Sequence, residues 1–138
     1  IESLPALLKA LEDRDSAVRY WGVTGIGNIG KRAGARAMTE ARKAMMDRSP
    51  SVRIGAARAV ARLGAPDVAI PVLVSELKSE HQWGRLAAAI VLDEMDEEAR
   101  PALEALQQAV KQRQPNKYIV RVANRAVNDL LGTENRVP

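Results

Sequence analysis

The sequence predicts an all-α fold, built as an array of about four helix pairs in a chain of 138 residues. Three observations predict it. Alanine occupies 23 positions whereas only two Trp, two Tyr and no Phe are present, so the core must be packed closely from Ala, Val, Leu and Ile. A dipeptide that ends in arginine recurs at intervals of 34, 32 and 36 residues. Each of these arginines is followed, eleven positions later, by a residue suited to ending a helix.

The recurring dipeptides mark the second helix of each pair. Eleven residues make three helical turns, and a glycine after the last apolar position stops a helix in the left-handed conformation. The second helices are therefore expected to begin in a polar turn just before the arginine. Ser16, Ser49 or Ser51, and Asn116 are the candidate N-caps. The arginines and the helix ends are Arg19 with Gly30, Arg53 with Gly64, Arg85 with Asp96, and Arg121 with Gly132.

The first helix of each pair is predicted from apolar residues spaced at a period of 3.6 upstream of each arginine. Pro5, Pro71 and Pro101 predict where three of these helices start, and the remaining one is expected near residues 37–46. The repeat units are then residues 2–33, 34–66, 67–99 and 100–133 of a single repeat domain over residues 1–138. The turn at residues 112–116 is the longest, and residues 133–138 are expected to fray. Because the chain opens at Ile1, we expect a fragment of a larger protein.

Three glycines in the second helix of the first unit predict close backbone contact or a bend. Gly22, Gly25 and Gly27 would each cost a helix roughly 1 kcal/mol relative to alanine. Gly25 to Gly30 also matches G-x-G-x-x-G. A dinucleotide site needs that motif at the start of a helix, after a strand, whereas here it falls at a helix end.

No residue is predicted to carry chemistry, so the catalytic, cofactor-binding and metal-binding sets are empty. There is no Cys and only one His, which excludes thiolate chemistry and His-rich zinc sites. His81 stands without a nucleophile at a recognisable spacing, and the acidic run at residues 93–98 lacks the spacing of a calcium loop. The repeated arginines are interpreted as structural, each pairing with a carboxylate in the preceding turn or in the adjacent repeat.

The aromatic residues leave two interpretations open. Trp21 and Trp83 lie near the starts of second helices, where they would fill gaps between repeats. The alternative is contact with a partner, because aromatic residues are enriched at interface anchors. The last helix carries apolar residues on two adjacent stripes, Leu130 among them, so at least one end of the array is expected to be apolar and to favour association.

Charge differs between the predicted units. Basic minus acidic residues give +1 for residues 1–33, +5 for 34–66, −6 for 67–99 and +4 for 100–138. The sequence pI near 9.8 suggests nucleic acid, but an acidic unit would interrupt a basic groove that follows a phosphate backbone. No apolar run approaches the length that spans a membrane, and no signal peptide is visible.

Helix pairs of about 33 residues, with Val-Arg opening the second helix, resemble HEAT repeats, which are related to armadillo repeats and form an α-solenoid or superhelix. Four segments resemble, more narrowly, the C-terminal HEAT-like region appended to certain bacterial sulfatases. They are Asp15-Ser-Ala-Val-Arg-Tyr-Trp-Gly, Pro50-Ser-Val-Arg-Ile-Gly-Ala-Ala-Arg, His81-Gln-Trp-Gly-Arg-Leu and Asn116-Lys-Tyr-Ile-Val-Arg-Val-Ala-Asn-Arg-Ala-Val-Asn-Asp-Leu-Leu-Gly-Thr.

This narrower resemblance implies a parent hydrolase of the arylsulfatase type, periplasmic or secreted, which cleaves sulfuric esters in a calcium-dependent α/β domain upstream. The family's formylglycine nucleophile arises in a C/S-x-P-x-R motif. Ser49-Pro-Ser-Val-Arg does not match that motif, so no catalytic residue carries over and this chain is not expected to be an enzyme.

Three functions are therefore considered. The first is an accessory domain that docks on its own upstream catalytic domain, mediates oligomerisation with a second copy, or shapes access to a sulfated substrate. The second is a stand-alone scaffold that binds another protein. The third, a nucleic-acid-binding array, is disfavoured by the acidic unit at residues 67–99.

Overall fold

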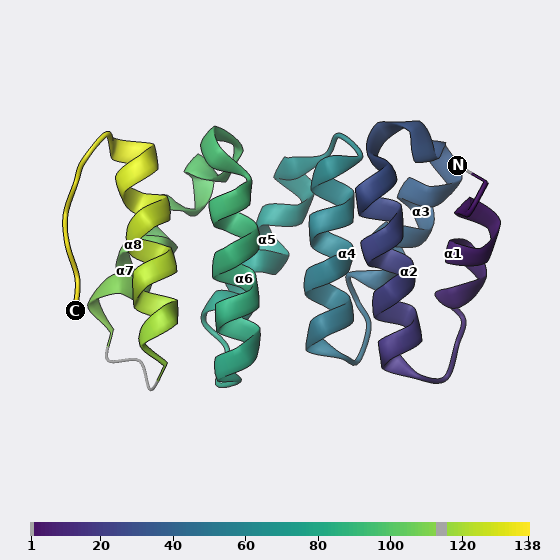
Figure 1. The fold of residues 1–138 in the computed structure, drawn as a ribbon, viewed down its shortest axis with the longest axis horizontal. Helices are drawn as coiled ribbons and strands as arrows, with labels where there is room; N and C mark the ends of the chain where they lie inside the picture. Colours follow the sequence, from purple (N-terminus) through teal and green to yellow (C-terminus); the bar gives the residue numbers. More distant parts are fainter. Residues whose placement is uncertain (1, 113–115) are drawn as a thin grey trace. The chain divides into compact units, whose positions relative to one another are not determined.

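Helices account for most of the chain. The computed structural model describes residues 2–112 and 116–138, and within these it contains eight α-helices, two 3-10 helices and no strand (Figure 1). The predicted all-α fold is confirmed. In chain order the elements are α1 (Leu4–Ala10), α2 (Ser16–Ile29), η1 (Gly30–Ala33), α3 (Gly34–Ala44), α4 (Pro50–Arg62), α5 (Pro66–Leu77), α6 (Gln82–Glu94), η2 (Asp96–Ala102), α7 (Leu103–Lys111) and α8 (Lys117–Leu131).

The described chain divides into two compact units, with the boundary between Val72 and Leu73 inside α5. In the N-terminal unit α2 packs beside α4, while α1 packs on α2 and α3 packs on α4. In the C-terminal unit α8 packs against both α6 and α7, and η2 contacts all three of these helices. Each unit thus has the two-layer arrangement that lets amphipathic helices bury one face.

The core of both units is aliphatic. Among the fully buried large side chains are Ile26, Val52 and Val60 in the N-terminal unit, and Leu92, Leu106 and Ile119 in the C-terminal unit. Many of the remaining buried positions are alanines, which allow neighbouring helices to approach closely. The four aromatic residues take no part in this core, since all of them are exposed.

The predicted ends of the second helices are confirmed by backbone conformation. The backbone φ is positive at all four predicted end residues, 75° at Gly30, 118° at Gly64, 51° at Asp96 and 67° at Gly132. Asp96 is the one non-glycine residue with positive φ among residues 2–112 and 116–138. The aspartate at this position therefore adopts a conformation that L-residues other than Asn and Asp seldom occupy.

The predicted helix starts are partly wrong. Pro5 lies in the first turn of α1 as expected, but α5 begins at Pro66 and holds Pro71 in its interior. Pro101 lies in η2, before α7 begins. Proline fits the first turn of a helix because its missing N–H has no partner there in any case. Pro66 meets that condition, five residues before Pro71. Part of the long turn predicted at residues 112–116 lies outside the described residues.

The caps of the second helices also differ from expectation at two places. Asn116 Oδ1 accepts a hydrogen bond from the Tyr118 N–H at 2.9 Å, as predicted. The first cap is Asp15, whose Oδ1 accepts from the Ala17 N–H at 2.8 Å, and Ser16 is already helical. Ser49 occupies the N-cap position of α4 but makes no capping hydrogen bond with its side chain.

The three glycines of α2 mark close helix contacts, as the sequence predicts. A Cβ at Gly22 would lie 2.8 Å from the carbonyl oxygen of Leu7, and one at Gly25 would lie 2.4 Å from a methyl carbon of the same leucine. A Cβ at Gly27 would lie 3.2 Å from the Cα of Ala59. Gly22 and Gly25 therefore admit α1, and Gly27 admits α4.

Candidate functional site

The repeated arginines close the turns between helices. The Nη1 of Arg19, Arg53 and Arg85 each donates a hydrogen bond to the backbone carbonyl six residues earlier, at 2.9, 3.0 and 2.7 Å. Arg19 and Arg53 also bond the carbonyl five residues earlier. The structural interpretation holds: all three arginines bind the main chain of the preceding turn, and Arg19 also pairs with a carboxylate of the adjacent unit, Asp47, as predicted. For Arg121 the equivalent carbonyl lies outside the described residues.

Arg19 additionally joins the first two helix pairs. Its Nε lies 2.9 Å from Asp47 Oδ2 and its Nη2 lies 3.1 Å from Asp47 Oδ1, a bidentate pair in which both side chains are largely shielded from solvent. The hydrogen bond to Asp47 raises the pKa of Arg19. Burial raises the pKa of Asp47, but the hydrogen bonds from Arg19 and from the Ser49 N–H outweigh it and hold that pKa below its ordinary value.

The lowered pKa of Asp47 predicts a pH dependence of stability. A carboxyl group whose pKa is lower in the folded state contributes stability above its unfolded pKa, near 3.8, and loses it as pH falls through the folded value. Asp47→Asn is expected to lower the free energy of unfolding at pH 7, and the difference from wild type should shrink below about pH 4. Urea unfolding at pH 7, 5 and 3 measures this difference.

The control is Glu12→Gln, at an exposed carboxylate of the same unit. It should change the free energy of unfolding little at any of these pH values. A difference between Asp47→Asn and wild type that is constant with pH would contradict the assignment.

The side chains of Trp21 and Trp83 are exposed, which contradicts the expectation that they fill gaps between repeats. Trp21 is 54% exposed and Trp83 is 62% exposed. Tyr20 and Tyr118 are also exposed, although the Tyr20 ring edge lies close to Gly55 of α4. Each tryptophan directly precedes a buried glycine, Gly22 after Trp21 and Gly84 after Trp83. Adjacent residues of a helix point in different directions, so the glycine faces the packed side and the indole faces solvent.

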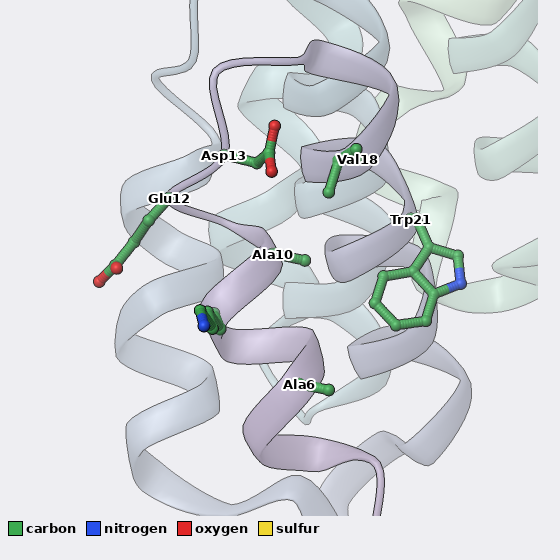
Figure 2. Close-up of a pocket in the computed structure, with 7 residues that line it drawn as sticks. Ala6, Ala10, Glu12, Asp13, Val18 and Trp21 are labelled. Carbon is green, nitrogen blue, oxygen red and sulfur yellow. The ribbon is translucent and has the colours of Figure 1, made fainter.

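Trp21 and residues of α1 line a shallow groove in the N-terminal unit (Figure 2). It has a volume of about 430 Å³. Ala6 and Ala10 lie one turn apart on α1, and their small side chains face the indole across the gap, while Glu12 points away from it. We call this feature the Trp21 groove. Its lining residues are Ala6, Lys9, Ala10, Glu12, Asp13, Val18 and Trp21.

The lining of the Trp21 groove is mixed. Alanine, valine and indole side chains lie there beside the charged side chains of Lys9, Glu12 and Asp13. A neighbouring groove of about 400 Å³ contains the Arg19–Asp47 pair and is lined largely by charged residues.

Among the described residues, the other motifs make structural contacts. His81 is the N-cap of α6, and its Nδ1 accepts a hydrogen bond from the Gly84 N–H at 3.0 Å. The G-x-G-x-x-G segment ends α2, as expected. In the acidic run, Asp93 pairs with Arg125 at 2.6 Å and Glu97 with Arg100 at 2.7 Å. Among the described residues no group of three metal-ligating side chains converges, and no helix there is long and apolar enough to cross a membrane.

The C-terminal end of the chain differs from expectation in two respects. Leu130 is buried, at 6% exposure, so it does not form the apolar end face predicted from the sequence; Leu131 is exposed instead, at 45%. Residues 133–138, which the sequence predicts to fray, lie along α8, where Asn124 and Asn128 form hydrogen bonds with Asn135. Nothing in the hydrophobic pattern of the sequence indicates this contact, since polar side chains make it.

Three features define a helical repeat protein: the helices form pairs, the core is aliphatic, and an arginine binds the main chain of the turn in successive pairs. A family model described as HEAT repeats matches residues 38–128, which is more than half of the chain, and the chain therefore belongs to the HEAT-repeat family. Nothing in the match links it to sulfatases, and no curated protein matches the sequence.

Solved structures of other proteins share this fold, among them the following two. One is an engineered protein, with a TM-score of 0.67 and 21% identity over 95% of this chain and 63% of that one. The other is the complex of CpcE and CpcF of phycocyanin lyase from Nostoc sp. PCC7120, with a TM-score of 0.57 and 19% identity over 94% of this chain and 65% of that one. The present chain spans less than two thirds of the length of either match.

Proposed function

We propose that this chain is a protein-binding HEAT-repeat scaffold and that the Trp21 groove is a contact surface of its N-terminal unit. The proposal rests on one observation: all four aromatic side chains are exposed, and the buried core contains no aromatic residue. Each of these rings leaves about half of its surface or more in solvent, whereas buried Trp and Tyr rings supply much of the energy at protein interfaces.

Two further observations support a protein partner. One of the structures with this fold was solved as a complex of two proteins, CpcE and CpcF. The charge distribution disfavours nucleic acid, because residues 67–99 carry eight acidic and two basic side chains. A phosphate backbone would meet repulsion there, while a protein with its own charge pattern gains specificity from the alternation.

The narrower interpretation, an accessory domain of a sulfatase, is a second proposal that rests on the resemblance of four segments, which begin at Asp15, Pro50, His81 and Asn116. The sequence upstream of Ile1 tests it. A formylglycine motif with metal-binding Asp and Asn residues in that region would support it. Without them, the stand-alone scaffold is the better description.

The proposed contact surface is tested by measuring affinity with single substitutions. A partner is captured with the full chain from cells that encode it, purified, and titrated against each variant by calorimetry. Trp21→Ala is expected to weaken binding at least tenfold, equivalent to about 1.4 kcal/mol. Met46→Ala is the matched control, because Met46 is a large side chain, 88% exposed, outside the Trp21 groove. Equal affinity of wild type and Trp21→Ala for every purified partner would overturn the assignment of this groove.

A further inference from the structure

Residues 133–138 fold back along the outer stripe of α8. The helix ends at Gly132, in the left-handed conformation with φ 67° and ψ 34°, and the chain then reverses beside α8 (Figure 1). The Thr133 N–H donates to the Asn128 carbonyl at 3.0 Å and closes the helix. Hydrogen bonds farther along the tail come from Arg121, Asn124 and Asn128, which lie three and four residues apart on one face of α8 and which we call the α8 stripe.

Asn128 pairs with the tail as a neighbouring strand would. Its Oδ1 accepts from the Asn135 N–H at 3.1 Å, and its Nδ2 donates to the Asn135 carbonyl at 2.9 Å. A side-chain amide has one carbonyl and one NH₂ group, so it can satisfy both polar groups of one peptide residue. Asn124 Nδ2 donates to the same Asn135 carbonyl at 2.8 Å, and Arg121 Nε donates to the Pro138 carbonyl at 3.3 Å.

These contacts exceed what a helix end requires. The backbone N–H groups of Gly132 and Thr133 already close the helix on the Asn128 carbonyl, whereas Asn124 and Arg121 lie one and two turns before that residue. Asparagine is also a poor helix former, at roughly 0.6 kcal/mol against alanine, yet two asparagines occupy this stripe. Within the tail, the Thr133 hydroxyl also donates to Asn128 Oδ1 at 2.7 Å. From Asn135 onward, however, the bonds reach main-chain atoms, so in this part the stripe contacts the peptide backbone rather than particular side chains.

We propose that the α8 stripe is a binding site for an extended peptide segment, read through its main chain, and that residues 133–138 occupy it in cis as a replaceable strap. The tail is suited to replacement because all its residues are exposed except half-buried Val137, and a segment held by exposed hydrogen bonds with little apolar burial opens at low cost. This site is separate from the Trp21 groove, so either proposal stands or fails without the other.

The test displaces the strap in the full-length chain and supplies it again as a free peptide. Asn135→Pro removes the N–H that Asn128 accepts and leaves the chain length unchanged. The probe is the hexapeptide Thr-Glu-Asn-Arg-Val-Pro, followed through the side-chain amide signals of Asn124 and Asn128 by NMR. Saturable shifts are expected for the Asn135→Pro chain. Wild type should need at least tenfold more peptide, because its own tail competes at a local concentration in the millimolar range.

Matched variants distinguish recognition of the peptide main chain from recognition of its side chains. In the Asn135→Pro background, Asn128→Ala and, independently, Asn124→Ala should weaken the peptide at least tenfold, with circular dichroism showing that each chain stays folded. Asn28→Ala, in the N-terminal unit, should have no effect. A peptide with alanine as its third residue should bind as the original does, and one methylated on the nitrogen of that residue should not. Absence of binding to Asn135→Pro, or equal binding of the methylated peptide, would overturn the proposal.

Discussion

Replacing Gly22 by valine is expected to lower the free energy of unfolding by about 1–3 kcal/mol, the usual cost of adding bulk to a packed contact. A Cβ at this position would lie 2.8 Å from the Leu7 carbonyl oxygen and 2.9 Å from a methyl carbon of Leu11. Side chains can rotate away, but the carbonyl belongs to α1, so the whole helix must shift. Chemical denaturation monitored by circular dichroism measures the change.

The control for Gly22→Val is Ala17→Val, which adds the same side chain at an exposed position of the same helix. Helix propensity alone predicts the opposite order, because valine is a better helix former than glycine and a worse one than alanine. If Gly22→Val proves more stable than Ala17→Val relative to wild type, the close approach of α1 and α2 does not constrain this position.

Leu106→Ala is expected to cost about 2–5 kcal/mol, the range for truncating a buried leucine. Leu106 of α7 is fully buried, and α7 packs against α8. In a core built largely of alanine, the neighbouring side chains are too short to fill the space that the leucine leaves. The midpoint of urea unfolding and its slope together give the change in stability.

Leu131→Ala provides the comparison for Leu106→Ala, since Leu131 is a leucine of the same unit that is 45% exposed. Its truncation should cost about 1 kcal/mol or less, because most of the removed surface already contacts water. Similar losses for the two variants would show that the packing of α7 on α8 contributes less than the burial of Leu106 implies.

The sequence predicted helix ends better than helix starts, for a physical reason. A helix stop of this kind needs positive φ, which few residues adopt readily, so Gly30, Gly64 and Gly132 indicate it directly. Asp96 is indicated only by its spacing from Arg85. Proline is compatible with more than one position in and before a helix, and Pro71 therefore indicated the wrong start for α5.

The candidate sites were harder to predict because they depend on details finer than the helical period. Each step along a helix rotates the side chain by about 100°, so Trp21 and the buried Gly22 beside it fall on different faces. The hydrophobic period locates the buried face of a helix only to within about one residue, so it does not separate two adjacent residues. The contact between Asn128 and Asn135 depends on the direction the chain takes after Gly132, which the hydrophobic pattern does not encode.

The hydrogen bonds from the repeated arginines to the turns affect how the sequences of such repeats can diverge. Arg19, Arg53 and Arg85 bind main-chain carbonyls, and every residue type supplies a main-chain carbonyl. A mutation in the turn can therefore change the side chain there without removing the acceptor, whereas a mutation of the arginine removes the donor. Within this one chain the three turns read Asp-Arg-Asp-Ser, Asp-Arg-Ser-Pro and Ser-Glu-His-Gln, starting at Asp13, Asp47 and Ser79, while the arginine six positions after each start is the same. Duplicated units held in this way can vary in the side chains of the turn while keeping its geometry.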